Sequence, residues 1–155
     1  MKQKLRVGDT IPVFKLQDQN GEWVDLKDFI GLKKLVIYFY PKDDTPGCTK
    51  EACSFSDQFE DFKAVNAEVF GISADDVSSH KKFAEKYRLS FRLLSDGNNE
   101  VRKLFGVPSD LFGLLPGRVT YVVNLEGKLI YQFNSQLNAE KHVSEALQKL
   151  QQDAL

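Results

Sequence analysis

The sequence predicts an α/β fold, with a central mixed sheet flanked by helices and a β-hairpin at the N-terminus. Residues 35–40 are continuously apolar, as in a strand that is buried on both faces of a sheet. Strand and helix patterns alternate through the middle of the chain, which is typical of α/β proteins with helices on both faces. At 155 residues, 42% of them hydrophobic, the chain can bury a core of its own, and we expect a single domain over 1–155.

The N-terminal hairpin is predicted by two short alternating segments. Apolar and polar residues alternate over 13–17 and 22–26, and the Asn-Gly pair between them is a strong hairpin signal. The buried strand follows at 34–40, and the proline after it ends the strand.

The rest of the chain combines loop residues, helical periods and short apolar runs. Apolar residues recur every three or four positions after Cys48, which predicts a helix to about Val65. The same patterns predict the later elements. In chain order we expect a loop at 42–47, strands at 68–73 and 91–94, helices at 77–87 and 99–105, a second hairpin of 118–124 and 128–133, and a last helix at 139–152.

Charge and hydropathy exclude several classes of function. There are 21 basic and 22 acidic residues, so no excess positive charge is available to bind a nucleic-acid backbone. No apolar run reaches the roughly 18–20 residues that a membrane span needs. The N-terminal residues are charged and lack the apolar centre of a secretory signal. We therefore expect a cytoplasmic protein, with a mature organellar form as the alternative.

The cysteine and histidine counts argue against structural cross-links. Two cysteines are too few for a disulfide scaffold. His80 and His142 lie far apart and outside any short ligand motif, and Cys-x4-Cys alone does not complete a tetrahedral zinc site. We expect no metal site, and the two cysteines become candidates for chemistry.

Cys48 occupies a position that prepares a sulfur atom for reaction. Thr45 is a favoured N-cap residue and Pro46 suits the first helical position, so Cys48 falls in the first turn. Unpaired N–H groups and the helix dipole favour an anion there, and the thiolate is the reactive form of cysteine. The Thr45 hydroxyl could donate to the sulfur or to a bound oxygen species. An ordinary buried cysteine is the alternative interpretation.

Cys53 is predicted on the same helix, five residues further along. An ideal helix separates the two Cα atoms by about 8.5 Å, and a disulfide cannot bridge more than about 7 Å without backbone movement. The cysteines can pair only if the first turns unwind, and Pro46 and Gly47 ease such unwinding. The pair therefore has the character of a redox switch, with core burial of Cys53 as the alternative.

Arg118 is a candidate cationic partner for the sulfur. It opens an apolar strand after a Pro-Gly turn, and its guanidinium keeps its charge and offers a planar set of donors. It could stabilise a thiolate and polarise a bound oxygen ligand. A solvated arginine at a strand end is the alternative. Thr120 on the same strand is assigned first to packing, with a role near the site as the alternative.

Residues 40–53 resemble the active-site segment of peroxiredoxins, and within them the peroxiredoxin Q group, also called bacterioferritin comigratory protein. Pro41, Thr45 and Cys48 fill its Pro-x3-Thr-x2-Cys pattern without a gap. The second cysteine at plus five also matches the group. Elsewhere, 7–14 is similar to the family's opening segment, and 118–120 is similar to its Arg-x-Thr strand.

Two features depart from the pattern of the group. Ser56 stands where the pattern leads us to expect a basic residue, which affects the surroundings of Cys53. The loop 108–116 is also unusual, and we expect it to shape access to the pocket and hence the preference for a peroxide.

The resemblance implies a thioredoxin-like fold and a thiol peroxidase that acts on hydrogen peroxide and organic hydroperoxides. Cys48 would be the peroxidatic cysteine, which becomes a sulfenic acid. Thr45 and Arg118 would hold the peroxide, and Pro41 would shield the sulfenic acid from solvent. Cys53 would resolve it as an intramolecular disulfide, reduced in turn by thioredoxin. No cofactor is needed, and an intramolecular disulfide is compatible with a monomer.

Two other functions use the same cysteine pair. A dithiol–disulfide oxidoreductase is less favoured because such enzymes carry Cys-x-x-Cys at the helix start, whereas the spacing here is Cys-x4-Cys. A thioredoxin-like sensor that transmits oxidation to a partner remains open. A sensor would oxidise once and stop, whereas an enzyme would turn over with a reductant.

Overall fold

The computed structural model describes residues 5–107, 109–110, 115–135 and 138–153, and its centre is a seven-stranded mixed sheet with the order β2-β1-β5-β4-β3-β8-β9. β3 pairs in parallel with β4, and β4 with β5, while the remaining pairs are antiparallel. The strands are β1 (Lys15–Gln17), β2 (Trp23–Asp25), β3 (Lys34–Phe39), β4 (Ala67–Ser73), β5 (Arg92–Ser95), β8 (Val119–Val123) and β9 (Leu129–Asn134).

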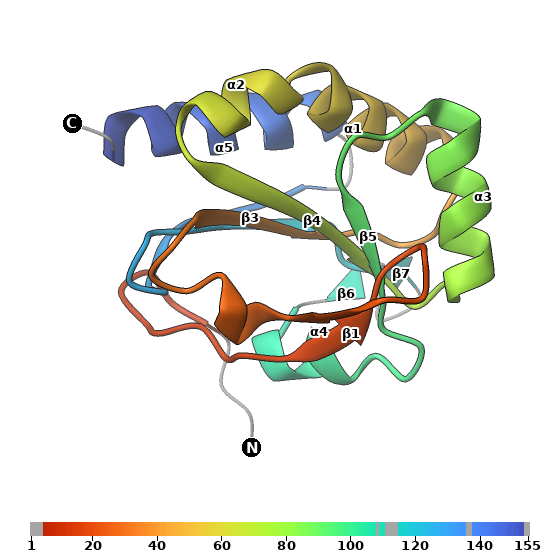
Figure 1. The fold of residues 1–155 in the computed structure, drawn as a ribbon, viewed down its shortest axis with the longest axis horizontal. Coiled ribbons are helices and arrows are strands. Elements are labelled where there is room, and N and C mark those ends of the chain that lie inside the picture. The colour runs from red at the N-terminus through yellow and green to blue at the C-terminus, as the bar shows by residue number, and fades with distance from the viewer. Residues whose placement is uncertain (1–4, 108, 111–114, 136–137, 154–155) are drawn as a thin grey trace.

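Helices cover both faces of this sheet (Figure 1). The helices are α1 (Pro46–Asp57), α2 (Phe59–Ala64), α3 (Val77–Tyr87), α4 (Glu100–Phe105) and α5 (Ala139–Asp153), with a short 3-10 helix η1 (Leu26–Asp28). In Figure 1, α1, α2 and α5 form a layer above the sheet, and α4 lies on the opposite side. The predicted α/β architecture with its N-terminal hairpin is therefore confirmed. None of the helices in the described part of the chain is long and apolar enough to span a membrane.

Strand β3 lies in the interior of the sheet, between β4 and β8, and its side chains alternate between two core clusters. Val36 and Tyr38 pack against α1, α2, α3 and α5, together with Phe55. Leu35 and Ile37 pack on the other face, where α4 and the N-terminal hairpin close the core. The continuous apolar run is explained because both sets of side chains are buried.

The N-terminal hairpin closes through a five-residue loop between β1 and β2. The Asp18 carboxylate accepts hydrogen bonds from the N–H groups of Asn20 (2.8 Å) and Glu22 (3.1 Å). Gly21 has φ of 77°, in the left-handed region that glycine adopts without strain. The Asn-Gly signal thus marks the turn, as predicted.

The single helix predicted from Cys48 to about Val65 is wrong in one respect, because it is divided in two. Gln58 has φ −100° and ψ 13°, so α1 ends before it and α2 begins after it. Two serines and an aspartate precede the break, and these residues are weak helix formers because their side chains compete for backbone hydrogen bonds.

The predicted loop at 108–116 contains two further short strands. β6 (Ser109–Asp110) and β7 (Leu115–Pro116) pair antiparallel to form a small separate sheet. Strands of two residues are too short to show the alternation of apolar and polar residues that predicts a strand. The expectation that this loop shapes access to the pocket depends largely on residues 108 and 111–114, which lie outside the described residues.

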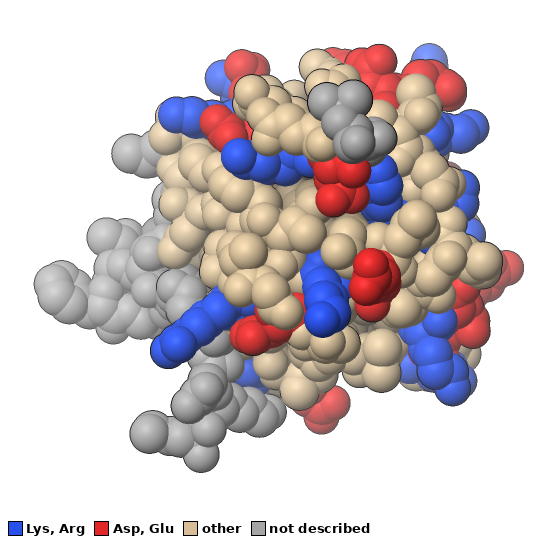
Figure 2. All heavy atoms as spheres, turned by 90° about the vertical axis from the view of Figure 1, so that its left-hand side faces the viewer, with Lys and Arg blue, Asp and Glu red and all other residues tan. Residues whose placement is uncertain are grey.

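Surface charge agrees with the balanced composition. Figure 2 shows lysine and arginine side chains interspersed with aspartate and glutamate on one face, around a broad uncharged area. Among the coloured atoms of that face, no extended patch of one sign is visible.

Candidate active site

Cys48 lies in the first turn of α1, at the carboxyl end of β3, as the capping pattern predicts. Thr45 is the N-cap residue, with extended backbone, and Pro46 begins the helix. Cys48 is buried and packs in the core cluster on the α1 side of the sheet. The Thr45 side chain makes no capping bond, however. Its hydroxyl donates to the Lys42 carbonyl oxygen at 2.9 Å, so it tightens the loop before the helix.

Arg118 is brought to Cys48 by the pairing of β8 with β3. It lies directly before β8, whose first residue pairs with the last residue of β3. Arg118 is buried, and its Nη2 donates to Cys48 Sγ at 3.2 Å. Gly47 makes room for this contact, because a Cβ at this position would lie 3.1 Å from Arg118 Nη2. The sequence prediction placed these two side chains together, and the geometry agrees.

Glu51 is a member of this site that sequence reasoning missed. It lies one turn after Cys48 on α1, is fully buried, and accepts a hydrogen bond from Arg118 Nη1 at 2.5 Å. Arg118 therefore bridges Cys48 and Glu51. Burial raises the pKa of Glu51 to about 8, although the Arg118 charge acts in the opposite direction. A charged residue at i+3 from Cys48, on the same face as Ala52 and Phe55, is the signal that could have found it.

His142 from α5 lies behind Glu51. Its Nδ1 is 3.6 Å from Glu51 Oε2 and 2.7 Å from the Thr120 hydroxyl, and its Nε2 is 2.7 Å from the Ser135 carbonyl oxygen. Nε2 therefore donates to Ser135, and Nδ1 accepts from Thr120. Burial lowers the pKa of His142 to about 4. Thr120 is buried within β8. It contacts His142, and His142 in turn lies beside Glu51.

Arg102 connects the backbone segments that carry Pro41 and Arg118. The sequence reasoning did not single out this residue. Arg102 donates from Nη1 to the Gly117 carbonyl oxygen (3.0 Å) and from Nη2 to the Tyr40 carbonyl oxygen (3.2 Å). These carbonyls directly precede Arg118 and Pro41 in the chain. Pro41 itself is half-buried. Arg102 lies three residues before Phe105 on the short helix α4, and this spacing from an apolar residue is the signal that could have identified it.

Cys53 differs from Cys48 in burial and in its charged neighbours. It is half-buried on the same helix, and partial burial together with the Asp57 charge raises its pKa. Both cysteines are free, and α1 runs without a break through both. The separation of about 8.5 Å expected for an ideal helix therefore applies to them.

The Cys48 site contains a fixed cation, which leaves no reason for a metal ion beside the sulfur. Elsewhere among the described residues, Asp43, Asp75 and His80 offer potential ligand atoms within 4.8 Å of one another. This cluster lies at the loop that carries Pro41 and Thr45. The geometry as a whole supplies a buried cysteine at a helix start, a guanidinium on its sulfur, and a second cysteine one and a half turns away.

Known proteins share this sequence and this fold. The AhpC/TSA family model matches residues 7–132. Peroxiredoxin Q, chloroplastic, from Triticum aestivum is 55% identical over 148 residues, which cover 96% of this chain and 68% of that protein. Among solved structures, peroxidoxin BcpB from Mycobacterium tuberculosis matches with a TM-score of 0.88 and 38% identity over 96% of this chain and 97% of that chain. PrxQ from Xylella fastidiosa, solved as a cysteine-to-serine mutant, matches with a TM-score of 0.90 and 29% identity over 99% of both chains.

The family model covers most of the chain, and the wheat relative is more than half identical along nearly all of it. The resemblance seen in residues 40–53 is thereby confirmed. This chain belongs to the peroxiredoxin family, in its peroxiredoxin Q group, and is a peroxidase of the oxidoreductase class.

Proposed function

We propose that this peroxidase reduces hydrogen peroxide and organic hydroperoxides at Cys48, and that Cys53 then forms an intramolecular disulfide that thioredoxin reduces. The observation that carries the proposal is the buried Cys48 sulfur, 3.2 Å from the guanidinium of Arg118 at the start of α1. A permanent cation and a helix N-terminus both favour the thiolate over the thiol.

The first step is oxidation of the sulfur. The Cys48 thiolate attacks the terminal oxygen of the hydroperoxide, an S–O bond forms, and the O–O bond breaks. Cys48 becomes a sulfenic acid, and the alkoxide or hydroxide that leaves takes up a proton to give the alcohol or water. Arg118 stabilises the negative charge as it moves from the sulfur to the departing oxygen.

Thr45 and Pro41 shape the space in front of the sulfur. The hydrogen of the Thr45 hydroxyl is donated to the Lys42 carbonyl oxygen. The hydroxyl oxygen therefore remains free to accept a hydrogen bond from the O–H of the peroxide. Pro41 is half-buried and follows Tyr40, whose carbonyl oxygen accepts a hydrogen bond from Arg102. In this position Pro41 shields the sulfenic acid from solvent.

The second step requires the start of α1 to unwind. The Cys53 thiolate attacks the Cys48 sulfur, an S–S bond forms, and hydroxide leaves and is protonated to water. An ideal helix holds the two Cα atoms about 8.5 Å apart, so the bond forms only after the turn that contains Glu51 has opened. Thioredoxin or a similar dithiol then reduces the disulfide by exchange.

Compartment and assembly remain predictions. The composition favoured a cytoplasmic protein, with a mature organellar form as the alternative. The relatives named as chloroplastic support the organellar form and give the cytoplasmic prediction no support. A monomer is sufficient for the proposed cycle, because both cysteines belong to one chain.

Stopped-flow oxidation by hydrogen peroxide, followed by mass mapping of the product, tests the proposal. We expect rapid single-equivalent oxidation, a disulfide that joins Cys48 to Cys53 within one chain, and sustained turnover with thioredoxin, thioredoxin reductase and NADPH. A disulfide between two chains contradicts the resolving role of Cys53. A single oxidation without turnover identifies a sensor and contradicts the enzymatic cycle.

A further inference from the structure

A second buried polar cluster ties the loop between β3 and α1 to helix α3. Asp43 lies in this loop, two residues after Pro41 and two before Thr45, and is 7% exposed. His80 lies in the first half of α3 and is fully buried. We call the group that surrounds them the Asp43 cluster, and its members are Tyr40, Asp43, Asp75, Ser79 and His80.

The Asp43 carboxylate has three partners. Oδ1 accepts a hydrogen bond from the Tyr40 hydroxyl at 2.6 Å. Oδ2 accepts one from the Ser79 hydroxyl at 2.8 Å and lies 2.7 Å from His80 Nδ1. The backbone N–H of Asp43 donates to Asp75 Oδ2 at 2.9 Å. The loop is thus fixed through both the side chain and the backbone of one residue.

The contact between His80 and Asp43 needs a proton of its own. His80 Nε2 lies 3.0 Å from the Leu94 carbonyl oxygen, which can only accept, so Nε2 carries a hydrogen. Nδ1 faces a carboxylate oxygen, which is also an acceptor, and a neutral imidazole has only one N–H. The arrangement is satisfied when a second proton lies between Nδ1 and Oδ2. The pair is then a buried, charge-assisted hydrogen bond, which is stronger than a neutral one.

The same three residues that could bind a metal are better described as hydrogen-bonded. Two ligands on one tetrahedral zinc ion at 2.0–2.1 Å lie about 3.3 Å apart. Asp43 Oδ2 and His80 Nδ1 are separated by only 2.7 Å, which is a hydrogen-bond length. Asp75 meanwhile accepts from the Ser73 hydroxyl at 2.6 Å. The Asp43 carboxylate, Asp75 Oδ2 and both ring nitrogens of His80 therefore already have protein partners.

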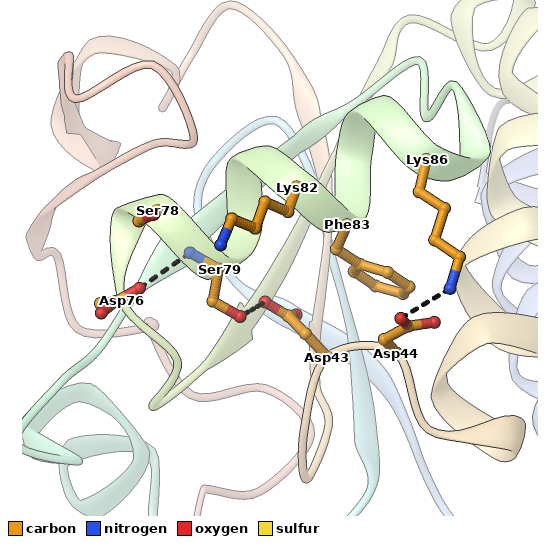
Figure 3. Close-up of a pocket in the computed structure, with 8 residues that line it drawn as sticks. All are labelled: Asp43, Asp44, Asp76, Ser78, Ser79, Lys82, Phe83 and Lys86. Carbon is orange, nitrogen blue, oxygen red and sulfur yellow. Dashed lines mark hydrogen bonds and ion pairs between the residues drawn. The ribbon is translucent and has the colours of Figure 1, made fainter.

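The neighbouring Asp44 provides a natural comparison. Figure 3 shows both aspartates extending from the loop toward α3, with Asp43 bonded to Ser79 and Asp44 to Lys86, around a cavity of about 360 Å³. Asp44 is exposed, and its carboxylate accepts from Lys86 Nζ (2.9 Å) and the Tyr87 hydroxyl (2.8 Å). Exposed ion pairs contribute little because water screens them, so the buried contact is the stronger anchor.

We propose that Asp43 and His80 are positioning residues for the peroxidase reaction, whose bond holds the loop in place while the first turn of α1 unwinds. This inference rests on the proposed function. The anchor lies before Thr45 in the chain, and the turn that must open for disulfide formation lies after it. Thr45 and Pro41 therefore keep their positions through the cycle, and the peroxide pocket is restored each time the helix refolds.

The inference is tested by measuring oxidation of Cys48 and formation of the disulfide as separate steps. In Asp43→Ala we expect the second-order rate constant for oxidation of Cys48 by hydrogen peroxide to fall about 10- to 100-fold, as small misplacements of reacting groups do. The first-order formation of the Cys48–Cys53 disulfide should be unchanged or faster. In the control Asp44→Asn, both constants should stay within about twofold, since asparagine tolerates the positive φ of 57° at this position. Partial unfolding alone would lower the amplitudes of both phases and leave their rate constants alone.

Conservative variants separate the bond from the charge. In Asp43→Asn the amide can donate to Nδ1 of a neutral His80 and still accept from Tyr40, so we expect most of the oxidation rate to return. His80→Leu should behave as Asp43→Ala does. Nitrogen-15 NMR at pH 7 should find both ring nitrogens of His80 protonated in the wild type and only Nε2 protonated in Asp43→Asn.

Several results would overturn the inference. Asp43→Ala could oxidise at the wild-type rate, or wild-type His80 could carry a single N–H. Added Zn²⁺ that raises the melting temperature of the wild type, but not of His80→Leu, would make the cluster a metal site. These outcomes are distinct from failure of the proposed function, in which the wild type itself would not be oxidised at Cys48.

Discussion

Cys48 and Cys53 lie on one helix, five residues apart, and they meet opposite surroundings. Cys48 is buried in the first turn, with a guanidinium nitrogen 3.2 Å from its sulfur. Cys53 is half-buried, and both its partial burial and the Asp57 carboxylate raise its pKa. The difference comes from tertiary contacts, since Arg118 reaches the helix from a segment 70 residues away. A shared helix therefore does not give two equivalent thiols.

The contrast also assigns an order to the two cysteines. A fixed cation beside a sulfur favours the reactive thiolate, whereas partial burial and the Asp57 carboxylate raise the pKa of the Cys53 thiol. In the proposed cycle, Cys48 therefore attacks the peroxide first. Cys53 reacts only after α1 opens and frees it from these surroundings.

Replacing each cysteine in turn should have the largest effect and should distinguish the roles of the two sulfurs. We expect Cys48→Ser to abolish peroxide consumption, because no nucleophile remains beside Arg118. Cys53→Ser should retain the first oxidation of Cys48 and lose recycling by thioredoxin. Stopped-flow oxidation and a thioredoxin-coupled NADPH assay measure the two steps separately. Sustained thioredoxin-linked turnover in Cys48→Ser would contradict the assignment.

Removing the cation should make the two sulfurs more alike. In Arg118→Ala we expect the rate constant for Cys48 oxidation to fall roughly 100-fold, in the range found when one donor to a developing anion is lost. Stability should also fall, because Glu51 would remain buried without its partner.

The double variant Arg118→Ala with Glu51→Gln separates these two effects. It should recover much of the stability and none of the oxidation rate. If the double variant also recovers the rate constant for Cys48 oxidation, Arg118 contributes only to stability and not to the reaction.

Crowding the cation should have a smaller effect. In Gly47→Ala the new Cβ lies 3.1 Å from Arg118 Nη2, so the guanidinium must shift, which disturbs its 3.2 Å contact with the Cys48 sulfur. We expect the oxidation rate constant to fall several-fold. Alanine also favours the helix by roughly 1 kcal/mol over glycine, so disulfide formation should slow as well. Gly97→Ala is a matched control, because nothing lies within 4 Å of its Cβ position. Equal rates in the two variants would remove the steric argument.

The smallest effect concerns the proton on Glu51, the other partner of Arg118. Its pKa is raised to about 8 from an ordinary 4.5, so the folded protein retains a proton that the unfolded chain releases. This contribution to stability is present at low pH and is lost as pH rises between those values, by at most about 1.4 kcal/mol per pH unit.

Urea unfolding between pH 6.5 and 8 should therefore show wild-type stability decreasing relative to Glu51→Gln. His142, with its pKa lowered to about 4, is present in both proteins, so its titration cancels in this comparison. Parallel stability curves for the two proteins would mean that Glu51 is ionised throughout, and that Arg118 is shared between two anions.

Local chemistry allowed much of the fold and the central part of the site to be predicted. Thr45 and Pro46 predicted the helix start, and the apolar run of β3 identified an interior strand of the sheet. Glu51 and Arg102 were missed because burial of a charge depends on which partner another element delivers. Asp43 and His80 were missed for the same reason, since their contact joins residues 37 positions apart.

The break at Gln58 has a consequence for how the molecule opens. Because α1 ends there and α2 begins its own hydrogen bonding with Phe62 N–H to the Gln58 carbonyl oxygen, the two helices are separate units of backbone protection. We therefore expect the amides of α1 to exchange with solvent as one group while those of α2 stay protected. In the proposed cycle, opening for disulfide formation would then be confined to the segment that carries both sulfurs, and the sheet beneath it would stay folded.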